Sequence, residues 1–194
     1  MINLKSILVI IVFIFSGLVY SQSIQFFREK IEVDVNGSFC QIKGIYYFKN
    51  SSNKEVSRTF YYPFVVNEKM LYPDSIIIKD LGNDRIINFS TSKSGIHFRA
   101  HLPAKSIIIY KIIYSQRTQA REIEYILTTT RKWGRPLEQA EFIVRIPKTF
   151  QLVSLTFPYN YRKNENDINL YYINKENFIP EQNLIVKWVE LKVN

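Results

Sequence analysis

Two histidines, His97 and His101, have the spacing that most resembles a metal-binding pair. Neutral imidazole is a common metal ligand, and even spacing in a strand places both side chains on one face. Arg99 would lie between them on that face, and four residues along a strand span roughly 13 Å. No acidic residue separates them either. We therefore expect a solvated strand face, with no metal and no other cofactor.

Cys40 is the single cysteine, so the chain cannot form an internal disulfide. Free cysteines are among the most buried residues, and we expect a buried structural thiol, with an intermolecular disulfide as the alternative.

Glu122 and Glu124 share a strand face, but they flank apolar residues as in any exposed strand. The sequence contains no Gly-x-Ser-x-Gly elbow and no phosphate-binding glycine loop. We predict no catalytic residues and no enzymatic activity.

The basic segment from Arg117 to Arg135 is the most unusual feature of the sequence. An indole ring beside clustered cations suits an anionic sugar, a phosphate-rich glycan or another protein, because arginine offers paired donors and tryptophan offers flat apolar area. The alternative is that the tryptophan folds inward and closes one end of the domain. The candidate binding residues are Trp133, Arg131, Lys132, Arg135 and Tyr125.

Three pairs of adjacent tyrosines, Tyr46-Tyr47, Tyr61-Tyr62 and Tyr171-Tyr172, could form an aromatic platform for a carbohydrate. Adjacent residues in a strand point to opposite faces, so each pair places only one ring on the outside. A platform would need rings in register on neighbouring strands, which the sequence does not specify.

The elements that would position these residues are strands. Alternating apolar and polar residues recur along the chain, and short polar segments separate the runs. Asn36-Gly37 between two such runs predicts a tight type I′ hairpin. The expected strands are 31–35, 39–48, 59–66, 75–79, 85–89, 96–102, 107–114, 123–129, 142–146, 152–157, 168–172 and 184–193. We predict an all-β fold, an antiparallel sandwich of two sheets, with no helix longer than two turns; the best helix candidate, 137–142, is too short.

The first residues have the features of a secretory signal peptide. Lys5 precedes an apolar run from Ile7, and small residues follow where a signal peptidase would cut, which predicts cleavage after Ser21. An uncleaved anchor is the alternative, but the apolar run is shorter than the roughly 17 to 25 residues of a spanning helix. We expect residues 1–21 to be a signal peptide, residues 22–194 to be one domain, and no transmembrane helix in the mature chain.

Two stretches resemble exported β-sandwich domains. Gly44–Ser52 with Tyr62-Pro63-Phe64 resembles the early strands of exported immunoglobulin-like domains. Tyr125–Thr129, the loop Trp133–Leu137 and the strand Phe142–Pro147 are similar to a group of uncharacterised exported bacterial β-sandwich domains with a Tyr-x-Leu-Thr strand and a Trp-Gly-x-Pro loop. The resemblance implies an immunoglobulin-like fold and an extracytoplasmic location, and it carries no catalytic residues.

The 194-residue chain has a formal net charge of +9, which favours acidic partners. We expect a periplasmic or cell-surface protein that acts as an interaction or structural module, with another envelope protein as its partner and no nucleic acid. The alternative is a glycan-binding domain that holds an anionic polysaccharide with Trp133, Arg131 and Arg135. A hydrolase assembled from residues distant in the sequence, with a histidine beside a carboxylate in a deep pocket, is the third hypothesis.

Overall fold

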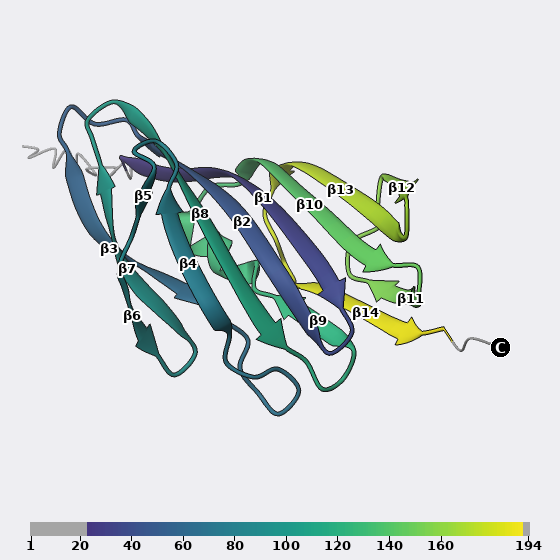
Figure 1. Ribbon diagram of the computed structural model, residues 1–194. Helices are drawn as coiled ribbons and strands as arrows, with labels where there is room; N and C mark the ends of the chain where they lie inside the picture. Colours follow the sequence, from purple (N-terminus) through teal and green to yellow (C-terminus); the bar gives the residue numbers. More distant parts are fainter. Residues whose placement is uncertain (1–22, 192–194) are drawn as a thin grey trace, which may run out of the picture.

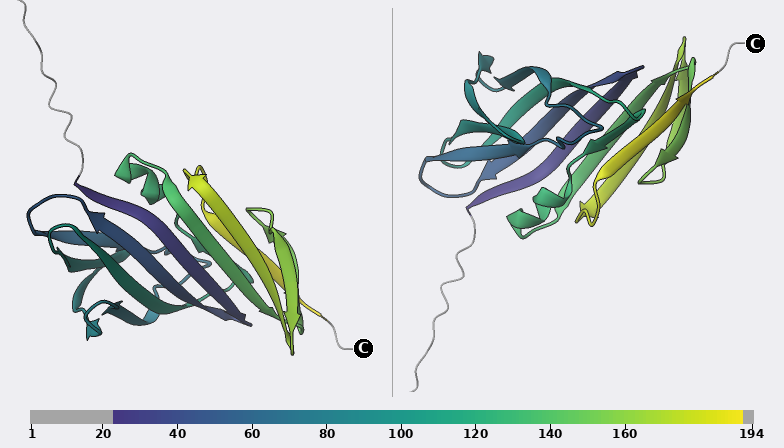
Figure 2. Two further views of the ribbon diagram at one scale, coloured as in Figure 1. Left: turned by 90° about the horizontal axis from the view of Figure 1, so that it is seen from above. Right: turned by 90° about the horizontal axis from the view of Figure 1, so that it is seen from below.

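The computed structural model of the chain describes residues 23–191, and the expected signal peptide, 1–21, lies outside them. The described residues form fourteen strands and one short 3-10 helix, so the predicted all-β class is confirmed. Within this range the structure contains no helix with the length and hydropathy needed to cross a membrane. The first strand begins at one end of the molecule, and the last strand ends at the opposite end (Figures 1 and 2).

The strands form one large sheet and two small ones. The large sheet has the order β12 (Tyr161–Glu165), β13 (Ile168–Phe178), β10 (Leu137–Pro147), β1 (Ile24–Asn36), β2 (Phe39–Asn50), β8 (Ser106–Arg117), β4 (Asp74–Asp80) and β5 (Arg85–Ile86). One small sheet has the order β11 (Phe150–Leu155), β14 (Leu184–Glu190) and β9 (Glu122–Tyr125). The other has the order β3 (Val56–Pro63), β7 (Gly95–Leu102) and β6 (Phe89–Ser92), and the helix η1 (Thr128–Trp133) follows β9.

This arrangement differs from the expected pair of antiparallel sheets in two respects. There are three sheets, and β1 pairs with β10 in parallel, from Arg28↔Gln139 to Asp34↔Arg145. A parallel pair requires a long crossover connection, and here the chain passes through β2 to β9 before it returns. Strand periodicity is the same for both pairings, so the sequence could not show this contact.

One face of the large sheet forms the main part of the core. Ile31 and Val33 of β1 are fully buried, and they lie opposite Gly44 and Ile42 of β2. Branched and aromatic side chains on this face suit a half-buried pleated surface, which is why the alternating runs become strands. Both small sheets contribute buried residues to the same core, including Phe98 of β7 and Val186 of β14.

The hairpin between β1 and β2 is confirmed, but its turn differs from the prediction. Asn36 pairs with Phe39, so Gly37 and Ser38 are the central residues. Only Gly37 of the two has a positive φ, at 61°. Glycine with positive φ at the first central position is the pattern of a type II′ turn, not of the expected type I′.

Strand limits differ from the expectation where side chains redirect the backbone. The predicted strand 123–129 ends at Tyr125, because Asn183 Oδ1 accepts hydrogen bonds from the N–H groups of Leu127 and Thr128, at 3.0 and 3.2 Å. The helix η1 then runs to Trp133, and Gly134 closes it with a φ of 68°. The short helix candidate 137–142 is part of strand β10.

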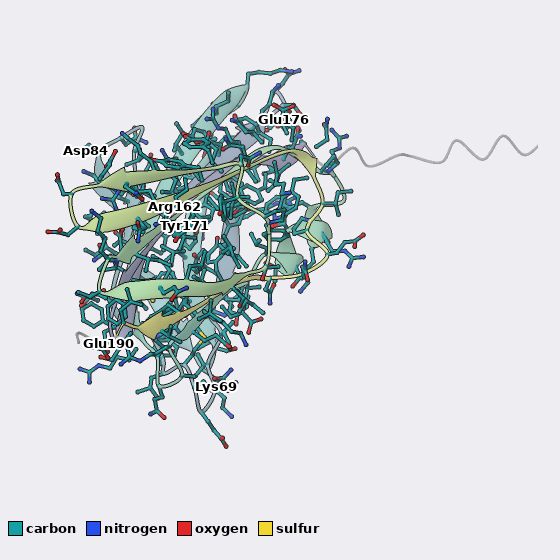
Figure 3. All side chains as sticks on the ribbon, turned by 90° about the vertical axis from the view of Figure 1, so that its right-hand side faces the viewer. Lys69, Asp84, Arg162, Tyr171, Glu176 and Glu190 are labelled. Carbon is teal, nitrogen blue, oxygen red and sulfur yellow. The ribbon has the colours of Figure 1, made fainter. Side chains whose placement is uncertain are left out.

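Strand β12 was not expected, because Lys163 to Glu165 belong to one of the short polar segments that separate the expected strands. It lies at an edge of the large sheet and is almost fully exposed, so it has no alternating apolar pattern. Arg162 of β12 lies over the ring of Tyr171 in β13, with 5.5 Å between the guanidinium carbon and the ring centre (Figure 3). Its guanidinium also donates to Asn169 Oδ1 at 2.7 Å. These contacts hold an edge strand that the hydrophobic pattern does not specify.

Candidate functional site

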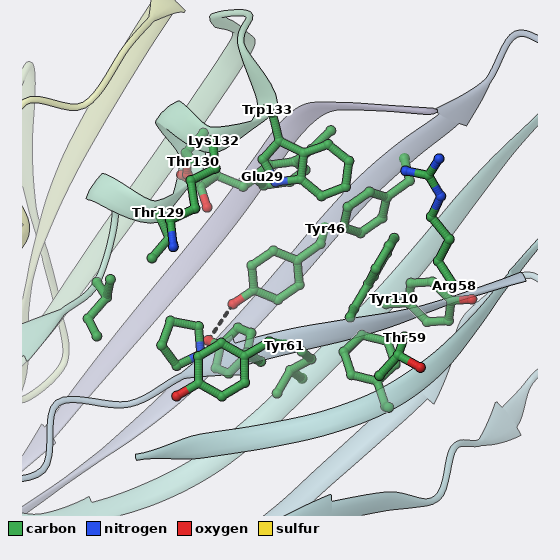
Figure 4. A pocket seen from close by; sticks show the side chains of 18 of the residues that line it. Glu29, Tyr46, Arg58, Thr59, Tyr61, Tyr110, Thr129, Thr130, Lys132 and Trp133 are labelled. Carbon is green, nitrogen blue, oxygen red and sulfur yellow. Dashed lines mark hydrogen bonds between the residues drawn. The ribbon is translucent and has the colours of Figure 1, made fainter. Parts of the chain in front are cut away.

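A cavity of about 420 Å³ lies where the three sheets meet (Figure 4). Its floor comes from β1, β2 and β8 of the large sheet, one wall from β3 and β7, and the opposite wall from β9 and η1. Pockets of this volume commonly accommodate small organic ligands.

Aromatic rings form most of the cavity wall. Trp133 of η1 lies 5.6 Å from Phe48 and 5.7 Å from Phe60, measured between ring centres. It also lies 6.1 Å from Phe26 of β1. Offset and edge-on ring contacts at these distances are favourable beyond their buried area. Trp133 therefore points inward and is a half-buried part of the wall.

Glu29 is the exceptional residue of the cavity. It lies on β1 with 1% of its surface exposed, and its Oε1 has no hydrogen-bond partner among residues 23–191. Burial in these surroundings raises the pKa of Glu29 to about 8, because the charged form loses its hydration. At neutral pH the side chain is mainly a neutral carboxylic acid, which carries an O–H donor.

A bulge in β1 determines which way Glu29 points. Phe26 pairs with Phe48 and Arg28 pairs with Tyr47, so Phe27 is an additional residue without a partner. Such a bulge reverses the alternation of side chains beyond it. Phe26 and Glu29 therefore both face the interior, although they are an odd number of residues apart.

Three tyrosine hydroxyl groups form a cluster in the same cavity. The Tyr46 hydroxyl lies 2.6 Å from the Tyr62 hydroxyl and 2.9 Å from the Tyr125 hydroxyl. Burial raises the pKa of all three well above 10, so they stay protonated at physiological pH. Two hydrogen bonds account for two of the three O–H protons, and the third can turn toward a ligand oxygen in the cavity.

Gly44 makes room for this cluster. A Cβ atom at position 44 would overlap the hydroxyl end of the Tyr46 side chain. The ring of Tyr46 therefore lies across the backbone of its own strand, and its hydroxyl reaches Tyr62 and Tyr125. No other residue type at position 44 permits this geometry.

The candidate binding residues of the basic segment separate in the structure. Trp133, Lys132 and Tyr125 line the cavity, and Arg58 of β3 is also among the lining residues. Lys132 and Arg58 are exposed, so they place positive charge at the rim. Arg131 and Arg135 are exposed as well, but they are not among the residues that line the cavity.

His97 and His101 lie on the exposed face of β7, as expected for a solvated strand face. Ser57 Oγ lies 3.3 Å and Glu55 Oε1 lies 3.4 Å from the same atom, Nδ1 of His101. In a catalytic triad the nucleophile and the orienting acid contact different ring nitrogens of the histidine, so this group is not one. Residues 23–191 contain no cluster of three His, Cys, Asp or Glu side chains that could hold a metal ion.

Cys40 is fully buried, which agrees with the expected structural thiol. Burial also raises the pKa of the Cys40 thiol, since the thiolate would lose its hydration.

The tyrosine pairs likewise follow the expected alternation, with Tyr46 buried and Tyr47 half-buried on the opposite face.

Sequence reasoning missed Glu29, Gly44 and Arg58. The sequence did contain a sign that Glu29 is unusual. Glu29 stands two residues before the series Ile31, Val33 and Val35, so the alternation places an acidic side chain on the buried face. No comparable signal existed for Gly44 or Arg58, whose roles depend on β2, β3 and η1 lying around one cavity.

The comparisons with known proteins give a match to a family model over part of the chain and a likeness in fold. Residues 97–186 match the family described as "Domain of unknown function (DUF4424)". This range is less than half of the chain, and it includes Tyr125 and Trp133 but not Glu29, Tyr46 or Tyr62. A search of curated proteins found no match.

Among solved structures, the chain is similar to a Legionella pneumophila protein that is provisionally described as a nutrient binding protein. The TM-score is 0.70 at 14% sequence identity, and the match covers 86% of this chain and 67% of that one. An M1 zinc metallopeptidase from Deinococcus radiodurans matches with a TM-score of 0.51 at 10% identity, over 86% of this chain and 42% of that one. This chain therefore spans less than half of the metallopeptidase, and both likenesses show the fold alone.

Proposed function

We propose that this protein is a non-enzymatic, extracytoplasmic binding module that takes a small organic ligand in the cavity between its three sheets. The observation that carries the proposal is Glu29, a buried carboxyl group that lines a 420 Å³ cavity without a hydrogen-bond partner for its Oε1. Buried polar groups are nearly always paired, and a ligand in the cavity can supply the partner that Glu29 lacks. The likeness to a protein described as nutrient-binding supports the same class.

This proposal moves the site from an exposed loop into the interior. Trp133 contributes to a wall of tilted and edge-on rings and not to an exposed platform, since it packs against Phe48 and Phe60. The hypothesis of a glycan site formed by Trp133, Arg131 and Arg135 has less support, because the two arginines lie away from the cavity lining.

Fluorescence can test the cavity directly. The chain has two tryptophans, so a Trp188→Phe background leaves Trp133 as the single reporter in the cavity wall. The neutral probe N-phenyl-1-naphthylamine should quench Trp133 by energy transfer and bind saturably. Thr129→Phe places a ring at the cavity wall and should weaken binding by about tenfold or more, which corresponds to about 1.4 kcal/mol.

The matched control is Thr91→Phe, which adds the same ring at an exposed position of β6 outside the cavity. It should bind the probe as the parent protein does. Equal binding by both variants would place the probe elsewhere and contradict the proposal, as would the absence of saturable quenching.

A second candidate function, contact with another envelope protein, is favoured by the outer face of the large sheet. Ile86, Ile107 and Ile77 are 60%, 58% and 44% exposed, and Ile77 lies opposite Ile113 on the same face. Lys79 and Lys111 lie opposite each other on the same face of the sheet, next to the pair of Ile77 and Ile113. An apolar face that includes lysines suits a partner surface that is apolar and carries acidic residues opposite these lysines.

A pull-down from the envelope fraction tests this second function. Ile107→Glu should abolish recovery of a partner that Ile108→Val, a conservative change on the buried face, retains. A partner recovered equally with both variants would not use this face.

A further inference from the structure

We infer that the cavity selects small organic acids that carry a second oxygen acceptor, such as an aromatic oxo acid. This inference rests on the proposed function and names the chemical class of its ligand. It follows from three features of the described residues: the spare donors of the inner wall, the positive charge of the rim, and the aromatic body between them.

The inner wall offers O–H donors to a ligand. The cluster of Tyr46, Tyr62 and Tyr125 has one O–H more than it has hydrogen bonds. Glu29 is desolvated and neutral in this environment, so it contributes another O–H. A ligand oxygen with lone pairs, such as a ketone or hydroxyl oxygen, satisfies these groups, whereas a ligand that brings only apolar atoms leaves them unpaired.

The rim determines the charge of the ligand. Arg58 and Lys132 are exposed cations on opposite walls of the same cavity, one on β3 and one on η1 (Figure 4). They attract a carboxylate and repel an ammonium group at the entrance. An amine inside would also have to ionise Glu29 in an apolar environment before an ion pair could form.

Aromatic rings line the cavity between the inner wall and the rim. Phe26, Phe48, Phe60 and Trp133 form an apolar section that suits an aromatic or branched body. The ligand class is therefore an apolar body with a carboxylate at the rim and an oxygen acceptor at the inner wall.

Three probes with one carbon skeleton test the class by calorimetry. 4-Acetylbenzoate carries the carboxylate and the oxo group at opposite ends of its ring, 4-ethylbenzoate carries only the carboxylate, and 4-ethylbenzylamine carries the opposite charge. We expect 4-acetylbenzoate to bind about five- to tenfold more tightly than 4-ethylbenzoate, as for one or two net hydrogen bonds. The amine should bind most weakly of the three.

Substitutions test which residues contact each end of the ligand. Lys132→Gln and Arg58→Gln should each weaken both acids by up to about fivefold, the range for a partly exposed ion pair. Arg131→Gln and Arg135→Gln remove the same charge outside the cavity and should leave both affinities unchanged. Glu29→Leu removes one of the inner donors and should reduce the preference for 4-acetylbenzoate over 4-ethylbenzoate, whereas Glu29→Gln keeps a donor and should retain the preference.

The outcomes separate this inference from the proposed function. Tighter binding of the amine, equal binding of all three probes, or no binding of any of them overturns the ligand class. The proposed function survives each of these results as long as the neutral naphthylamine probe binds in the cavity and Thr129→Phe excludes it. Failure of that neutral probe, in contrast, removes the proposed function as well.

Discussion

Glu29 of β1 and Tyr46 of β2 are direct register partners on adjacent antiparallel strands, and both side chains line the same cavity. Side chains directly opposite each other on one face of such a pair lie within contact range. This relationship joins the neutral acid and the tyrosine cluster in one polar group, surrounded by rings.

The stability of the protein should fall as the pH rises, because of Glu29. Its pKa is about 8 in the folded chain and 4.5 in the ordinary case, so the folded state binds the proton more tightly. The stability that Glu29 contributes is fully present below pH 4.5, where both states are protonated, and is lost as the pH rises to about 8. In this window the free energy of unfolding should decrease by about 1.4 kcal/mol per pH unit from this group.

Glu29→Gln should remove that slope, as measured by chemical denaturation at several pH values between 5 and 8. Tyr46, Tyr62 and Tyr125, the groups that face Glu29, have pKa values raised well above 10 and stay neutral throughout. Glu32→Gln, on the opposite face of β1, should keep the parent slope. An identical pH dependence in the parent and in Glu29→Gln would show that Glu29 is not held neutral.

Tyr46→Phe should destabilise the protein by about 1–3 kcal/mol, because the buried hydroxyls of Tyr62 and Tyr125 both lose their partner. Tyr47→Phe removes a hydroxyl from the adjacent residue on the outer face and should change stability by no more than about 0.5 kcal/mol. Urea denaturation at one pH gives both values. Similar losses for the two variants would mean that the cluster contributes nothing specific.

Gly44→Ala should disturb the cavity although it adds only one methyl group. That methyl group would overlap the Tyr46 side chain, so we expect a loss of about 1–3 kcal/mol together with weaker ligand binding. Gly82→Ala is the matched control, because its nearest neighbour, Asp80 Oδ1, would lie 3.4 Å from the new atom in an exposed turn. Unchanged stability and unchanged binding in Gly44→Ala would contradict the described position of Tyr46.

Cys40 should react with a thiol reagent only when the protein unfolds. The side chain is fully buried, and its raised pKa disfavours the nucleophilic thiolate. Labelling with dithionitrobenzoate should therefore follow the denaturation curve. Rapid stoichiometric labelling of the native protein, or a dimer on a non-reducing gel, would instead support an exposed or intermolecular thiol.

The sequence by itself determined the class of the fold and the side of most strands. The series Ile31, Val33 and Val35 and the glycine of the first hairpin specify strands and a tight turn through local rules: period-two burial, and a positive φ that glycine adopts without strain. The same rules indicated that Cys40 is buried and that Tyr46 and Tyr47 face opposite sides. Each of these inferences needs only neighbours along the chain.

Only the tertiary structure decided the arrangement that makes the cavity. The parallel pairing of β1 with β10, the division into three sheets and the meeting of Glu29, Tyr62, Tyr125 and Trp133 depend on contacts between residues far apart in the sequence. The bulge at Phe27 reverses the alternation locally, and Asn183 ends β9 from more than fifty residues away. Periodicity carries no information on such contacts, because a strand has the same pattern whichever partner it meets.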